Sequence, residues 1–193
     1  MRGVPLLVIF SLLALALIGV PVAGASTGGA AFESKPQTTK KTKKLSRAAA
    51  LVPGQTATIG PDGLATVPIG APAEVRAAIE AANRIIGKPY KYGGGHAKVE
   101  DRGYDCSGTV SYALLGAKLL KSPLDSSSFM RWGEAGPGQW ITVYTNPGHA
   151  FVVIAGLRLD TSAAGDPSGA KGPRWRPTLR STRGFRARHP EGF

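Results

Sequence analysis

Apolar positions recur at helical spacing in two stretches of the chain. The first runs from Pro72 to Ile86, where the apolar residues that lie three or four positions apart are Val75, Ile79, Ala82 and Ile86. Pro72 stands at a suitable helix start and Gly87 just past the helix end. The second stripe, made of Val110, Leu114, Ala117 and Leu120, predicts a helix from about Cys106 to Leu120. Cys106 then occupies the first turn of that helix.

Shorter apolar runs predict strands. The stretch that opens with His149 indicates a strand, a tight turn near Ala155-Gly156 and a return strand that reaches Asp160. Residues 51–71 are punctuated by Pro and Gly, with short β-type pieces around 56–59 and 64–67. We therefore expect an extended lead-in before the first helix and a β-hairpin late in the chain.

The N-terminal apolar run has the pattern of a secretory signal peptide. Arg2 precedes an apolar stretch from Val4 to Val20, and small residues lead to Ala25, so cleavage is expected before Ser26. A retained membrane anchor is the alternative, but proline and serine interrupt the run, which is about as long as the shortest bilayer span. The sequence thus predicts a signal peptide over 1–25, a basic low-complexity arm and lead-in over 26–71, and a single domain over 72–193.

The formal net charge of +12 is concentrated in two clusters. The first follows the signal peptide and consists of Lys35, Lys40, Lys41, Lys43, Lys44 and Arg47. The second lies in the C-terminal part and consists of Arg158, Lys171, Arg174, Arg176, Arg180, Arg183, Arg186 and Arg188. Export argues against nucleic acid, so the favoured partner is an anionic cell-envelope polymer, and plain solubility is the alternative. We expect a monomer without a stable membrane span after cleavage of the signal peptide.

Cys106 is the only cysteine, so an exported chain carries a thiol with no partner for a disulfide. In the first helical turn, unpaired amides and the helix dipole favour the thiolate, which is the nucleophilic form. The small neighbours Ser107 and Gly108 let a substrate carbonyl approach those amides, as an oxyanion hole requires. A buried structural cysteine is the alternative.

Of the three histidines, His149 is the candidate base because it opens a strand and is therefore held rigidly. His96 follows three glycines on a loop that would hold an imidazole poorly, and His189 lies near a loose C-terminus. With a two-residue turn at Ala155-Gly156, Asp160 is the diagonal neighbour of His149 on the same face of the hairpin. It could orient the imidazole as the third member of a triad, or pair with an arginine such as Arg158 or Arg174 instead.

The motif Gly87-x-Pro89-Tyr90-x-Tyr92-Gly93-Gly94, followed by Tyr104-Asp105-Cys106-Ser107-Gly108-x-Val110 and by a strand that opens with a histidine, resembles the NlpC/P60 family of papain-like cysteine peptidases. The resemblance covers about residues 72–162. It implies an α+β fold in which the cysteine helix packs on a small antiparallel sheet, and cleavage of peptidoglycan stem peptides, commonly at D-γ-glutamyl-diaminopimelate bonds.

By the same resemblance, Cys106 is the nucleophile, His149 the base and Asp160 the third residue. Tyr92 would line the oxyanion and substrate site, while Asp105 and Ser107 would contact the stem peptide. Peptide hydrolysis through a thioester needs no cofactor, and one cysteine with three scattered histidines offers no zinc spacing. Two alternatives stay open: a non-catalytic envelope-binding protein on the same fold, and an amidase or acyltransferase that uses the same dyad.

Overall fold

The computed structural model describes residues 55–193. The predicted signal peptide over 1–25 and the basic arm as far as residue 54 lie outside the described residues. The helices are α1 (Ala73–Ile85), α2 (Cys106–Gly116) and α3 (Ser126–Phe129). The strands are β1 (Thr58–Ile59), β2 (Ala65–Thr66), β3 (Glu134–Ala135), β4 (Ile141–Asn146), β5 (His149–Ile154), β6 (Leu157–Asp160), β7 (Arg174–Arg176) and β8 (Arg186–His189).

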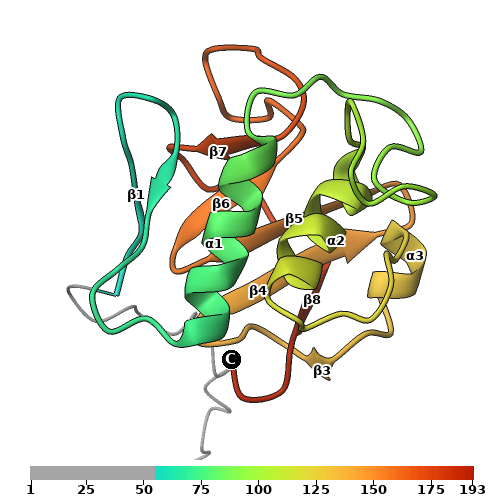
Figure 1. Cartoon of the computed structure of the whole chain (residues 1–193). Helices are drawn as coiled ribbons and strands as arrows, with labels where there is room; N and C mark the ends of the chain where they lie inside the picture. The colour runs from blue at the N-terminus through green and yellow to red at the C-terminus, as the bar shows by residue number, and fades with distance from the viewer. Residues whose placement is uncertain (1–54) are drawn as a thin grey trace, which may run out of the picture. The chain divides into compact units, whose positions relative to one another are not determined.

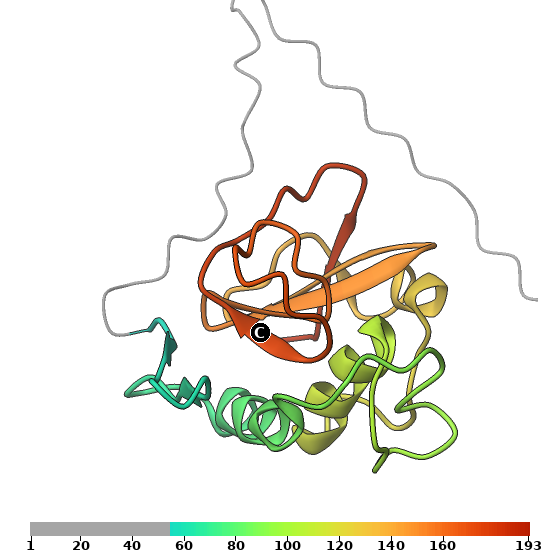
Figure 2. The ribbon, with the colours of Figure 1, turned by 90° about the horizontal axis from the view of Figure 1, so that it is seen from above.

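A six-stranded sheet in the order β3-β8-β4-β5-β6-β7 lies at the centre, and each neighbouring pair of strands is antiparallel. The helices α1 and α2 lie side by side on one face of this sheet (Figures 1 and 2). The predicted α+β class, with the helix that begins at Cys106 packed on an antiparallel sheet, is confirmed.

The core lies between the two helices and the sheet. Alternate residues of the central strands point to the helices, because side chains alternate across a strand; the fully buried ones include Ile141, Val143, Ala150, Val152 and Ile154. Both helices contribute the apolar residues that face this side, among them Val75, Ile79, Val110 and Leu114. The first predicted helix is confirmed to within one residue at its C-terminal end.

The second helix ends at Gly116, four residues before the expected end at Leu120. Lys118 has a φ of 58°, and the amide of Leu119 donates to the carbonyl of Leu114 at 2.9 Å. This is the Schellman motif, which ends a helix and turns the chain away from the helix axis. Leu119 and Leu120 still pack on the core, which explains why the apolar stripe runs past the helix.

The lead-in folds against the domain as a small β-hairpin of β1 and β2, at the two places expected from the sequence. Ala57 and Ala65 are buried in the core. Asn83 on α1 binds both backbone groups of Ala65, at 3.0 and 2.9 Å, and its Oδ1 also accepts from Nε1 of Trp175 at 2.7 Å. One amide side chain therefore ties the hairpin and β7 to the first helix.

Replacing Asn83 with alanine is expected to lower the free energy of unfolding by about 2 kcal/mol, because the Trp175 indole and the Ala65 backbone lose their partner together. Urea unfolding followed by circular dichroism measures this change. Glu80→Ala on the exposed side of the same helix is the matched control, with an expected effect below about 0.5 kcal/mol. Equal midpoints for the two variants would contradict the assignment of Asn83 as a tether.

The C-terminal basic cluster of the sequence does not form one surface patch. Arg158 and Arg176 are 0% and 1% exposed, whereas Lys171, Arg183 and Arg186 are exposed. Part of the positive charge of this cluster is therefore buried inside the fold. Between residues 55 and 193 no helix has the length and apolar character needed to cross a membrane.

Candidate active site

The hairpin of β5 and β6 brings His149 to Asp160. Ile154 pairs with Leu157, so the turn consists of Ala155 and Gly156, as the sequence predicts. Both turn residues have positive φ values, 47° and 78°, as a tight hairpin turn requires. In this register Asp160 lies diagonal to His149, and Nε2–H of His149 donates to Oδ1 of Asp160 at 2.9 Å.

Cys106 is the first residue of α2 and is half-buried. Asp105 caps the helix: its Oδ1 accepts from the amide of Gly108 at 2.7 Å, and its carbonyl accepts from the amide of Thr109 at 3.0 Å. The amides of Cys106 and Ser107 have no carbonyl within the helix to bind. These two amides are the donors that the helix start could offer to an oxyanion formed at Cys106.

Cys106 and His149 lie close enough that each shifts the pKa of the other. Burial raises the pKa of Cys106, but the hydrogen bonds from His149 and from the amide of Ala150, together with the charge of His149, hold it below its usual value. Burial lowers the pKa of His149, but the bonds to Asp160 and Cys106 outweigh this and raise it to about 9. Both shifts act in the direction of the thiolate–imidazolium form of the pair.

A cleft of about 450 Å³ opens at Cys106. It is lined by the loop before α2, by the start of α2, by the start of α3 and by the turn between β4 and β5; the residues are Tyr90, Tyr92, Gly93, His96, Asp105, Cys106, Ser107, Asp125, Ser126, Ser127, Pro147 and Gly148. The three substrate-site candidates from the sequence, Tyr92, Asp105 and Ser107, all border this cleft. Tyr92 is 91% exposed, so its ring stands at the rim.

Asp105 and Ser107 are 7% and 5% exposed, so little of either side chain faces the cleft. Besides capping α2, the carboxylate of Asp105 accepts from the amide of Gly93 at 3.0 Å. It thereby fixes the loop that carries Tyr92 to the start of the nucleophile helix. The contact of Asp105 and Ser107 with a substrate stays a prediction.

The close approach of this loop to α2 requires glycine at position 108. A Cβ there would overlap the carbonyl oxygen of Gly94, which also accepts from the amide of Asp105 at 3.3 Å. The glycines around the cysteine thus serve backbone packing between loop and helix. This use differs from the phosphate cradle that a glycine-rich loop can form.

Sequence reasoning missed His96, which it placed on a loop too loose to hold an imidazole. Its Nε2 lies 3.0 Å from Oδ1 of Asp105 and 3.3 Å from Oγ of Ser107, so the ring is held beside the cleft. The expectation for His189 is also corrected, because it lies in β8 and bonds to the carbonyl of Gly136 at 3.0 Å. Tyr90, another cleft residue not singled out, was visible only as part of the motif.

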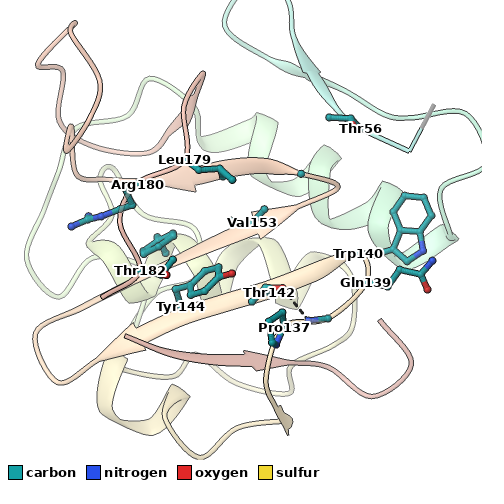
Figure 3. Close-up of a pocket in the computed structure, with 13 residues that line it drawn as sticks. Thr56, Pro137, Gln139, Trp140, Thr142, Tyr144, Val153, Leu179, Arg180 and Thr182 are labelled. Carbon is teal, nitrogen blue, oxygen red and sulfur yellow. Dashed lines mark hydrogen bonds between the residues drawn. The ribbon is translucent and has the colours of Figure 1, made fainter. Parts of the chain in front are cut away.

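A second cavity, of about 340 Å³, lies on the sheet face opposite the helices (Figure 3). Tyr144, Phe151 and Val153 line it from the strands, and Leu179 and Arg180 from the C-terminal segment. Cys106 does not border this cavity. Among residues 55–193, no group of three or more His, Cys, Asp or Glu side chains is arranged to hold a metal ion.

Comparison with known proteins gives related sequences. No protein-family model matches the chain. Over 107 residues the chain is 32% identical to a protein named "Probable endopeptidase" in Mycobacterium tuberculosis, and to one of the same name in Mycobacterium bovis. The match covers 52% of this chain and 26% of each relative, so the chain spans about a quarter of the relatives' length.

Two solved structures from Mycobacterium tuberculosis are also similar. The peptidoglycan hydrolase RipB has a TM-score of 0.44 and 20% identity, over 64% of this chain and 73% of that one. A hypothetical invasion protein has a TM-score of 0.45 and 23% identity, over 69% of this chain and 70% of that one.

Proposed function

We propose that this chain, whose motifs and endopeptidase-named relatives support its resemblance to the NlpC/P60 family, is a cysteine peptidase that cleaves peptidoglycan stem peptides. The observation that carries the proposal is the hydrogen-bonded pair of His149 and Asp160, at 2.9 Å, whose imidazole influences the thiol of Cys106, a residue that lines a cleft. A nucleophile, its base and an orienting carboxylate are the parts that covalent acyl transfer needs.

In the proposed reaction the thiolate of Cys106 attacks the scissile carbonyl carbon, and the C–S bond forms. The amides of Cys106 and Ser107 donate to the resulting oxyanion. His149 gives its proton to the leaving nitrogen as the C–N bond breaks, which leaves a thioester. Water then attacks the thioester, His149 takes the water's proton, and the C–S bond breaks to release the acid and the thiolate.

The bond and the place of action come from the family resemblance and the N-terminal sequence. NlpC/P60 peptidases commonly cut D-γ-glutamyl-diaminopimelate bonds, and the proposed substrate is that bond. The predicted signal peptide over 1–25 supports a reaction outside the cytoplasm, where peptidoglycan lies. The exposed basic residues, including Arg183 and Arg186, would meet an anionic envelope polymer favourably.

The test is digestion of purified muropeptides, with the products identified by mass spectrometry. The wild-type protein is expected to release fragments cut between D-glutamate and diaminopimelate, and Cys106→Ala to release none. Because Cys106 is the only cysteine, alkylation with iodoacetamide is a second, site-specific control and should also abolish cleavage.

Other outcomes would reject the mechanism, the proposed bond or the enzymatic function. Cleavage by Cys106→Ala at the wild-type rate rejects the thiol mechanism. Products cut at a different amide reject the proposed bond, and acyl transfer to an amine in place of water indicates a transferase. Salt-sensitive binding of cell walls that survives in Cys106→Ala, without any cleavage by the wild-type protein, indicates a non-catalytic envelope-binding protein.

A further inference from the structure

The carboxylate of Asp160 faces more positive charge than its bond to His149 accounts for. Its side chain is 0% exposed. Oδ1 accepts from His149 and from the amide of Ser162 at 2.8 Å, while Oδ2 accepts from Nη1 of Arg180 at 3.2 Å and lies 3.8 Å from Nε of Arg158. Burial raises the pKa of Asp160, but the bonds from His149, Ser162 and Arg180 outweigh it and lower the pKa.

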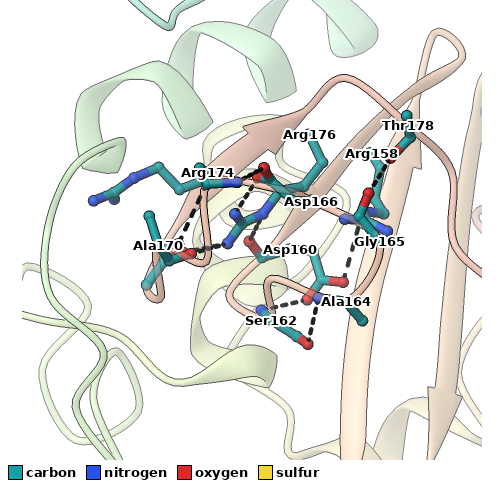
Figure 4. Close-up of polar contacts among 12 residues, drawn as sticks. Arg158, Asp160, Ser162, Ala164, Gly165, Asp166, Ala170, Arg174, Arg176 and Thr178 are labelled. Carbon is teal, nitrogen blue, oxygen red and sulfur yellow. Dashed lines mark hydrogen bonds and ion pairs between the residues drawn. The ribbon is translucent and has the colours of Figure 1, made fainter.

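Arg158 is a buried cation with no hydrogen bond of its own. It is 0% exposed, and within the described residues none of its three guanidinium nitrogens has a hydrogen-bond partner (Figure 4). Arg176, its pairing partner on the adjacent strand β7, already binds Asp166 at 2.5 Å and the carbonyls of Asp160 and Ala170. Isolated buried charge is costly, so the carboxylate of Asp160 is the group that compensates Arg158.

Arg180 is fixed in place beside His149. Its guanidinium lies over the rings of Phe151 and Phe185, 5.4 and 5.3 Å from their centroids. The same two rings flank the imidazole of His149, each with a centroid separation of 6.3 Å. The two aromatic rings therefore hold the guanidinium of Arg180 against Asp160, so its positive charge stays beside the carboxylate.

We propose that Arg180 is a positioning residue which, together with Arg158, offsets the negative charge of Asp160, so that the carboxylate pulls on the imidazolium proton of His149 less strongly than an unpaired carboxylate would. This inference rests on the proposed cysteine-peptidase function, in which His149 must both accept a proton and release it to the leaving nitrogen. A bare buried carboxylate would hold the imidazolium proton too tightly for that release. The offset keeps the geometry of the carboxylate bond and reduces its electrostatic pull.

Two roles for Arg180 predict opposite results. If Arg180 only held Asp160 in place, its removal would loosen the bond to His149, and the pKa of His149 would fall toward its ordinary value. If Arg180 offsets the charge, its removal exposes His149 to the full carboxylate, and the pKa of His149 rises.

Several charged and titratable groups surround the pair of His149 and Asp160. They are Cys106 and Asp105 at the start of α2, Arg158 on β6, Arg174 and Arg176 on β7, Asp166 in the loop before β7, and Arg180 itself.

The test is an NMR titration of His149 in protein labelled at histidine, in a Cys106→Ala background that excludes thiol chemistry. Arg180→Met keeps an apolar chain over the two rings, and we expect it to raise the pKa of His149 by about one pH unit. Arg180→Lys should restore the starting value. Arg183→Met, which removes an exposed arginine from the same segment, is the control and should leave the titration unchanged.

A fall in the pKa of His149, or no change, in folded Arg180→Met overturns the inference. Should that variant fail to fold, Arg180→Gln removes the same charge and is judged by the same criterion. The readout needs no turnover, so it stands even if muropeptides are not cleaved, and the two proposals can fail separately. In the active protein the alkaline limb of kcat/KM should move upward with Arg180→Met, as the titration does.

Discussion

His149→Ala is expected to reduce kcat/KM for stem-peptide cleavage by about 10³-fold or more. Burial raises the pKa of Cys106, and the loss of His149 removes two of the influences that oppose it, so the pKa of the thiol rises. The thiolate fraction near neutral pH falls, and no group protonates the leaving nitrogen. The rate of alkylation by iodoacetamide against pH measures the first effect, and muropeptide turnover measures both.

His96→Ala is the matched control, because a second imidazole lies beside the same cleft. Its Nε2 is bound to Asp105 and Ser107, so the variant should change kcat/KM less than about 10-fold and leave the alkylation profile near that of the wild type. If His96 proved essential and His149 dispensable, the assignment of His149 as the base would be wrong.

The wild-type pH profile follows from the same pair. The thiolate–imidazolium form appears as pH rises through the lowered pKa of Cys106, and it is lost as pH rises through the pKa of His149, at about 9. The alkaline limb of kcat/KM is therefore expected near that value. Its position is the reference against which the arginine variants are measured.

The pairing of His149 with Asp160 could be predicted from the sequence because it depends only on the length of the hairpin turn and on the alternation of side chains along the strands. A two-residue turn fixes the register of a hairpin, and side chains two positions apart share a face. Ala155-Gly156 supplied that turn, so the diagonal contact followed without knowledge of the rest of the fold. The first-turn position of Cys106 followed in the same way from helical periodicity.

The features that the sequence did not predict depend on contacts between distant segments. His96 is held by Asp105, whose side chain is fixed by a helix start that also ties down the glycine loop. All four residues of β6, Arg158 included, are buried, and no pattern along this short strand marks the arginine as an interior residue. The sequence suggested that Asp160 binds either His149 or an arginine, whereas a carboxylate with two oxygens binds both.

Asp105→Ala is expected to lower the free energy of unfolding by about 3 kcal/mol and kcat/KM by about 100-fold. The substitution removes the helix cap at Gly108, the anchor of the loop at Gly93 and the partner of His96 together. The amide of Gly108 is left buried without an acceptor, which costs more than losing an exposed hydrogen bond. The loop that carries Tyr92 then loses its fixed distance from Cys106.

Asp125→Ala separates capping from this combined role, because Asp125 also caps a helix start but is exposed. Its Oδ1 accepts from the amide of Ser128 at 2.8 Å, and within the part of the chain that the structure describes its hydrogen bonds stay in its own turn. The expected loss of stability is about 1 kcal/mol, measured by urea unfolding of both variants. Asp105→Asn keeps one acceptor oxygen and should fall between wild type and Asp105→Ala. Equal losses of unfolding free energy for Asp105→Ala and Asp125→Ala would mean that Asp105 acts only as a helix cap. Its hydrogen bond to the loop at Gly93 would then contribute nothing to stability.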